Sequence, residues 1–152
     1  MKAIDYFLPS TADKADLTAW LPILPGRARI LRSNLFADAF VVDSGGAVHM
    51  LERAACTAER IASSEEEFWR QVEDDAHGWQ LRALVDACRH AGKVLGDDQC
   101  YAFTTLPALG GDYTVGNVWV APWHNWLAFT ADMFQQIKDL PDGARVRLKI
   151  AD

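Results

Sequence analysis

The sequence predicts an α+β fold in which an antiparallel or mixed sheet packs against several helices, and three observations favour this class. Residues 39–42 and 47–51 are short, apolar, β-prone runs on either side of a glycine-containing turn over 43–46, the pattern of a β-hairpin. Residues 64–91 carry two amphipathic segments whose apolar positions recur with the period of a helix. The predicted order of elements is helix, strands, two helices, strands, helix and strand, which does not alternate as βαβ units do.

Length and composition indicate a single domain over residues 1–152. Of the 152 residues, 50% are hydrophobic and 24% are charged, which is typical of a globular chain and not of a disordered one. No apolar run reaches the ~18–20 residues that a membrane span requires, and the N-terminus lacks the pattern of a signal peptide. We therefore expect a cytoplasmic protein.

The net charge is −6, and the acidic residues are concentrated in the middle of the chain. Residues 33–101 hold six basic and thirteen acidic side chains, whereas residues 1–32 hold five basic and three acidic ones. Proteins that bind nucleic acid need a basic surface for the phosphates. The charge distribution therefore argues against nucleic acid as a partner and is compatible with a basic protein.

The N-terminal third of the chain is predicted to contain a helix and a strand before the hairpin. The helix would cover residues 11–21, with Ser10 as its N-cap and Pro22 directly after its end. Ile30 and Leu31 are predicted to lie in an earlier strand of the same sheet as the hairpin.

The two amphipathic segments are predicted to form consecutive helices. The first opens with a capping box, in which the Ser64 hydroxyl and the Glu67 carboxylate satisfy free backbone N–H groups, and Gly78 interrupts it near its end. Its apolar face is Phe68, Val72, Ala76 and Trp79, and its acidic face is Glu66, Glu67, Glu73 and Asp74. The second helix has Gly92 as its C-cap and an apolar stripe of Leu81, Leu84, Val85 and Cys88.

The C-terminal third is predicted to contain two strands, a helix and a last strand. Residues 101–106 and 118–121 have the composition of strands, and Pro122 suits the first turn of a helix that runs to about Lys138. Residues 145–150 alternate basic and apolar side chains, which is typical of a strand with one face in the core and one face in water.

Motifs for catalysis, metal binding or cofactor binding are not found in the sequence. The four histidines lie at spacings that exclude a helical zinc pair, and no two cysteines have metal-ligand spacing. His49 is predicted to be a structural histidine in a strand, and Cys88 to be an inert thiol on the apolar face of a helix. We therefore expect no catalytic residue, no metal ion and no cofactor.

The most distinctive local pattern is a glycine-rich segment over residues 110–117. Glycines that need positive φ angles in a tight turn explain such a pattern most simply. The segment matches no phosphate-binding loop, because the order of its glycines is different. A loop that binds a small ligand is the alternative interpretation, and its residues would be Gly110, Gly111, Tyr113 and Asn117.

Acidic and aromatic side chains offer a surface for a protein partner. Charge runs most often form solvated helix faces, but exposed carboxylates can also contact a basic protein. Three tryptophans lie within residues 119–126, and exposed tryptophans favour interfaces. We therefore predict that at least one of these rings is exposed and that a partner protein contacts Glu66, Glu73, Asp74 and Trp123.

Several short segments, in their order and spacing, resemble one family of bacterial domains. They are Ser33–Phe40, Asp43–Gly46, Ser64–Phe68, Cys100–Phe103, Leu109–Tyr113 with Asn117, Gln136 and Leu140–Gly143. The family consists of domains of unknown function and includes the C-terminal domain of immunity proteins against type VI secretion nuclease toxins. The resemblance covers roughly residues 17–143. Family members often carry glycine where this chain has Ala37, and many carry an additional N-terminal domain that is not found within these 152 residues.

The resemblance implies a cytoplasmic protein that binds and neutralises a cognate toxin, and it supplies no catalytic residues. Our main hypothesis is therefore an immunity protein, not an enzyme, whose acidic and aromatic side chains enter the basic cleft of a nuclease-like toxin in place of nucleic acid. The alternative hypothesis is a small-ligand binding or enzymatic domain with a pocket near Gly110 and Gly111. This alternative needs a cleft with converging polar groups at that turn.

Overall fold

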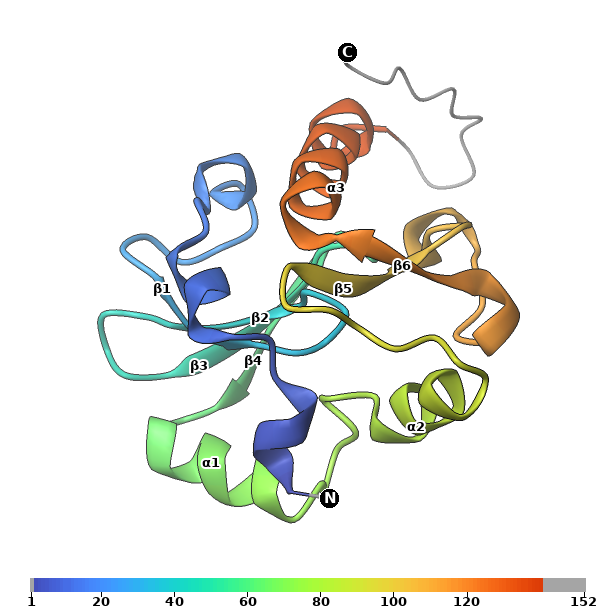
Figure 1. Cartoon of the computed structure of the whole chain (residues 1–152). Helices are drawn as coiled ribbons and strands as arrows, with labels where there is room; N and C mark the ends of the chain where they lie inside the picture. The colour runs from blue at the N-terminus through green and yellow to red at the C-terminus, as the bar shows by residue number, and fades with distance from the viewer. Residues whose placement is uncertain (1, 141–152) are drawn as a thin grey trace.

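The computed structural model describes residues 2–140, and in this part of the chain two antiparallel sheets pack with three α-helices (Figure 1). The sheets lie next to each other in the middle of the molecule, with α3 (Trp123–Ile137) on one side and α1 (Glu65–Glu73) and α2 (Arg82–His90) on the other. The α+β class with an antiparallel sheet and packed helices, which the sequence predicts, is confirmed.

The larger sheet has four strands in the order β1-β2-β3-β4. Their bounds are Arg29–Ser33, Ala39–Val42, Val48–Glu52 and Thr57–Ala62. The predicted hairpin is β2 and β3, and its turn is closed by the Asp43 carboxylate, which accepts the backbone N–H groups of Gly45 (2.9 Å) and Ala47 (3.0 Å). The sequence did not predict β4, because its Thr-Ala-Glu-Arg-Ile-Ala run lacks regular alternation between apolar and polar residues, and only Ala62 of this strand is buried.

The smaller sheet consists of β5 (Gln99–Phe103) and β6 (Val118–Pro122), which pair from Gln99 opposite Pro122 to Phe103 opposite Val118. The first of these strands begins and ends earlier than the predicted range of 101–106. The backbone N–H of Tyr101 donates to the carbonyl of Leu35 at 2.8 Å, so the outer edge of β5 is joined to the turn that follows β1.

The first amphipathic segment forms a shorter helix than predicted. Helix α1 ends at Glu73, and Asp75 has a left-handed backbone with φ 49°. Ala76 is therefore exposed, and Trp79 reaches the core only because the chain turns back and stacks its ring on Phe68, with centroids 5.8 Å apart. Helix α2, with Gly92 at its C-terminal end in a positive-φ conformation, and helix α3 after Pro122 agree with the predictions.

The single helix predicted over residues 11–21 is wrong. Two short 3-10 helices replace it, Ser10–Lys14 and Thr18–Trp20, and Ser10 is the first residue of one of them and not an N-cap. The Asp16 carboxylate accepts the backbone N–H of Thr18 at 2.9 Å and its hydroxyl at 2.6 Å. This local hydrogen bonding competes with a continuous helix. A further 3-10 helix, Ala3–Tyr6, precedes them, and two more, Pro107–Leu109 and Val115–Asn117, connect β5 to β6.

Three hydrophobic clusters hold these elements together. One joins α1 to the larger sheet through Phe40, Val48 and Phe68. Another joins α2 and α3 to the smaller sheet, and the third stacks Trp20 on Phe134 with centroids 4.6 Å apart. The predicted last strand over 145–150 lies outside the described residues. Among the described helices, none has the length and apolarity needed to cross a membrane.

Candidate functional site

The N-terminal end of α1 is held by its own side chains. Ser64 is the N-cap, and its hydroxyl accepts the backbone N–H of Glu67 at 3.1 Å. The Glu67 carboxylate turns back as predicted, but it accepts from the backbone N–H (3.1 Å) and the hydroxyl of Ser63, not from Ser64. These hydrogen bonds lower the pKa of Glu67. The Glu67 carboxylate therefore stabilises the start of the helix.

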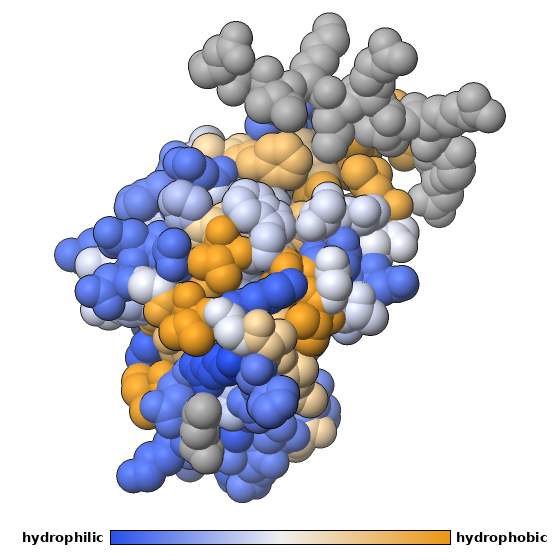
Figure 2. Space-filling model, turned by 45° about the vertical axis from the view of Figure 1, so that its right-hand side comes forward, coloured by the Kyte–Doolittle hydropathy of each residue, from blue (hydrophilic) through white to orange (hydrophobic). Residues whose placement is uncertain are grey.

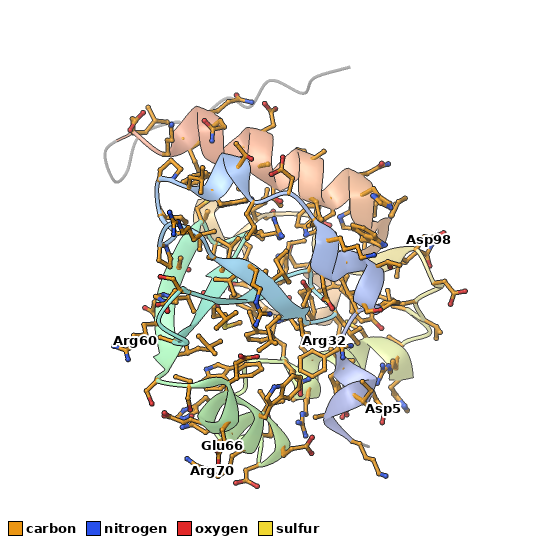
Figure 3. The ribbon with its side chains drawn as sticks, turned by 90° about the vertical axis from the view of Figure 1, so that its left-hand side faces the viewer. Asp5, Arg32, Arg60, Glu66, Arg70 and Asp98 are labelled. Carbon is orange, nitrogen blue, oxygen red and sulfur yellow. The ribbon has the colours of Figure 1, made fainter. Side chains whose placement is uncertain are left out.

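The acidic residues predicted to contact a partner lie on the exposed side of α1. Glu66, Glu73 and Asp74 are all exposed. Glu66 and Glu73 are seven residues apart and share one face of the helix, and Arg70 lies between them on that face. Figure 3 shows the side chains of Glu66 and Arg70 next to each other on the outside of the helix. A basic group thus interrupts the acidic surface, four residues after Glu66 and three residues before Glu73.

Trp123 does not lie on this surface. Its side chain is only 5% exposed, its ring stacks on His124 with centroids 3.6 Å apart, and it belongs to the cluster beneath α3. Helices α1 and α3 lie at opposite ends of the molecule (Figures 1 and 3). Trp119, on β6, is 47% exposed, which confirms the expectation that a ring of this group reaches the surface.

The glycine-rich segment over 110–117 forms a turn that is closed by Asn117. The Asn117 amide accepts the backbone N–H of Thr105 at 2.8 Å and donates to the carbonyls of Thr105 and Asp112, both at 2.8 Å. Gly110 has φ 91°, and a Cβ at Gly111 would lie 1.8 Å from the Thr105 carbonyl oxygen. An open hollow of about 300 Å³ lies beside these residues. Gly110, Gly111 and Asn117 line this hollow, but the Asn117 amide is used within the turn, and Tyr113 lines a different groove.

The three cysteines and His49 are placed for structure. Burial raises the pKa of Cys56 to about 11 and that of Cys100 to about 12, and it also raises the pKa of Cys88. Such thiols are protonated and poor nucleophiles at neutral pH. His49 Nε2 lies 2.9 Å from the Asp43 carboxylate, next to the hairpin turn. Within residues 2–140, no three His, Cys, Asp or Glu side chains come together where they could hold a metal ion.

A buried polar group, which the sequence analysis did not single out, lies beside the connection between α1 and α2. The Asn34 amide donates to the Asp38 carboxylate (3.1 Å) and to the carbonyl of Trp79 (3.0 Å). Arg53 is 2% exposed and donates to the carbonyl of Ala37 at 2.9 Å. Burial raises the pKa of Asp38 to about 7 and lowers the pKa of Arg53 to about 10. No local sequence pattern reveals the group, because its members come from three separate segments.

The same group determines the backbone conformation of Ala37, the position where the family resemblance implies glycine. Ala37 has φ 63° and is 1% exposed. This left-handed conformation costs an L-residue about 1–2 kcal/mol and costs glycine nothing. The turn around Asn34 imposes it on Ala37, so alanine is a strained residue at this position.

A groove of about 660 Å³ lies between α2 and residues 113–115. Its apolar lining comes from Leu81, Ala83, Leu84, Ala87, Tyr113 and Val115, and its charged lining from Asp75 and Arg82. Leu81 and Leu84 were predicted to be part of a buried stripe, but both are half-buried and open on this groove. Figure 2 views this side of the molecule and shows hydrophobic side chains in the middle of the face, with hydrophilic ones below and to the left.

One comparison with known proteins gives a match. The family model described as "T6SS immunity protein Tdi1, C-terminal" matches residues 62–134, which include α1, α2, β5, β6 and most of α3. The resemblance inferred from the sequence is thus confirmed over a shorter range than the predicted 17–143, and it supports an immunity role. Neither the curated proteins nor the solved structures contain a match.

Proposed function

From the similarity of residues 62–134 to the C-terminal domain of type VI secretion immunity proteins, we propose that this protein binds and neutralises a bacterial toxin in the cytoplasm. It acts by occupying a surface of the toxin, and it performs no reaction itself. The toxin is a basic, nuclease-like domain, whose charge complements the net charge of −6 of this chain.

The observation that carries the proposal is the exposed acidic surface of α1, made of Glu66, Glu73 and Asp74. A nuclease needs positive charge where it holds the phosphates of its substrate. Carboxylates on a rigid helix can occupy such a site in place of phosphates, and complementary charge also speeds the encounter of the two proteins. Trp123 is buried and takes no part in this contact.

The experiment is a pull-down from the native bacterium with this protein as bait, followed by mass spectrometry. We expect one basic, secreted-effector-like protein at stoichiometric yield. The purified partner is then titrated with the Glu66→Lys, Glu73→Lys, Asp74→Lys variant by calorimetry. A loss of affinity of at least tenfold supports the acidic surface, and unchanged affinity shows that the partner binds elsewhere.

Protection is the second measurement. Production of the captured partner in a heterologous host should stop growth, and this protein should restore it. If the captured protein is harmless, or if growth is not restored, the immunity role is wrong.

A further inference from the structure

We infer that the toxin contacts the groove between α2 and residues 113–115. An apolar side chain of the toxin fills the groove, and basic side chains of the toxin contact Glu73 and Asp74. This inference rests on the proposed function and assigns the place and the chemistry of the contact. Glu73 and Asp74 directly precede Asp75, which lines the groove, so the carboxylates and the apolar surface are neighbours.

The first argument is the position of the two acidic residues on α1. The C-terminal end of a helix carries partial negative charge, so carboxylates there are unfavourable by about 0.3–1 kcal/mol. Glu73 is the last residue of α1 and Asp74 is its C-cap, and both are exposed. Their charge therefore does not serve the stability of the helix, and a basic partner gives it a role.

The second argument is that the basic groups near the groove are already engaged. Arg82 donates to the carbonyl of Val72 and to the Gln80 side chain, and it lies 3.8 Å from the Asp75 carboxylate. Lys93 donates to the carbonyls of Val115 (2.6 Å) and Val118 (2.7 Å). Neither group is left to neutralise Glu73 and Asp74. Arg70, three residues before Glu73, is the exposed basic neighbour on the helix, so two exposed carboxylates face one basic side chain and the net charge beside the groove stays negative.

The third argument is that the connection over residues 74–81, which forms one wall, is strained and firmly anchored. Asp75 and Leu81 have positive φ angles of 49° and 51°, a conformation that costs L-residues energy and is concentrated at functional sites. The buried Gln80 side chain donates to the carbonyl of Ala3 at 2.9 Å, and Asn34 holds the carbonyl of Trp79. A wall that is fixed before binding loses little entropy when a partner docks.

The opposite wall presents an aromatic ring. Tyr113 is 46% exposed, and its ring packs edge-on against Phe103 with centroids 5.2 Å apart. Tyrosine is one of the side chains enriched among interface hot spots. A second groove, of about 430 Å³ beside Trp119, has no charged residue in its lining, so its charge does not indicate a basic partner.

A second copy of this chain is a poorer occupant of the groove. A two-fold contact would place the same patch of both copies together. The acidic residues beside the groove would then face one another, which is unfavourable for chains that each carry a net charge of −6.

The experiment is site-specific photo-cross-linking in the native bacterium, with benzoyl-phenylalanine placed at Ala83, Glu66 or Arg60. Ala83 is an exposed residue of the groove, Glu66 is at the far end of α1, and Arg60 lies on β4 and points away from the molecule in Figure 3. We expect the protein with the probe at Ala83 to be cross-linked to a peptide of the toxin that contains both basic and apolar residues. The protein with the probe at Arg60 should not be cross-linked.

The second measurement is calorimetry with the captured toxin. The Glu73→Lys, Asp74→Lys variant should bind at least tenfold more weakly, and Tyr113→Ala should also lose at least tenfold. Glu59→Lys, Asp97→Lys is the matched control, since it makes the same charge change at two exposed positions elsewhere. It should lose less than threefold.

The outcomes separate the two proposals. Cross-linking of the toxin at Glu66 but not at Ala83, with full affinity of Tyr113→Ala, overturns the groove and leaves the immunity role in place. The groove proposal is also overturned if the probe at Ala83 cross-links two copies of this chain and the Tyr113→Ala variant no longer forms that dimer. If no position captures a toxin and the protein gives no protection, the proposed function fails, and this inference fails with it.

Discussion

The two ends of α1 are both acidic, yet their carboxylates have different roles. At the N-terminal end, Glu67 accepts hydrogen bonds from Ser63, and negative charge there also interacts favourably with the helix dipole. At the C-terminal end, Glu73 and Asp74 are exposed and oppose the dipole. Folding accounts for the first group and not for the second. Charge that does not serve the fold is the better indicator of a binding surface.

The largest expected effect on stability comes from the buried ring of Phe68, on whose packing both ends of α1 depend. Phe68 is fully buried and packs against Phe40 and Trp79, with centroids 4.9 and 5.8 Å away. Phe68→Ala should lower the free energy of unfolding by about 3–5 kcal/mol, as measured by urea denaturation. A loss below about 1 kcal/mol would show that α1 is not held by this cluster.

A smaller effect is expected at the N-cap. Ser64→Ala removes the hydroxyl that accepts the Glu67 backbone N–H and should cost about 1 kcal/mol. Ser44→Ala, in the exposed hairpin turn, is the control and should change stability by less than about 0.5 kcal/mol. Equal losses in the two variants would contradict the capping role.

The charge of Glu67 gives the same end of the helix a pH dependence. Its pKa is lowered in the folded protein by the hydrogen bonds from Ser63, so the ionised form stabilises the fold. The stability difference between the protein and Glu67→Gln should be present at neutral pH. It should shrink as the pH falls below the ordinary value of 4.5 and disappear below the folded-state pKa. A difference that does not change between pH 7 and pH 3 would argue against this contribution.

The smallest effect on stability is expected at the C-terminal end. Glu73→Lys, Asp74→Lys places favourable charge at the end of the helix, so the free energy of unfolding should stay unchanged or rise by up to about 1 kcal/mol. This is the same variant that should lose toxin affinity. A marked loss of stability would mean that these carboxylates do serve the fold, and the comparison between the two ends would no longer hold.

The local elements could be predicted from the sequence where one strong signal determines them. The turn at Asp43 fixes the β2–β3 hairpin, Ser64 fixes the start of α1, and Pro122 fixes the start of α3. The early end of α1 was missed, because the chain turns at Asp75 and the connection that follows is held by contacts of Trp79 and Gln80 with distant residues. Tertiary contacts of this kind leave no local pattern.

The candidate site was predictable only in part. The exposure of Glu66, Glu73 and Asp74 follows from the helical period, since Phe68 and Val72 occupy the opposite face. The burial of Trp123 was not predicted, because a helix of mostly apolar residues does not indicate which of its rings faces outward. The groove joins residues 81–87 to residues 113–115, and no periodicity connects two segments so far apart.

The close approach at Gly111 limits how this loop can diverge among relatives. Any side chain at position 111 would collide with the Thr105 carbonyl, which is also the group that the Asn117 amide holds. Mutational tolerance should therefore change abruptly within two residues. Position 110 can accept a residue that tolerates a left-handed backbone, such as asparagine, whereas position 111 should accept only glycine unless the loop is rebuilt. In a saturation library of this turn, position 110 should tolerate substitutions and position 111 should tolerate none.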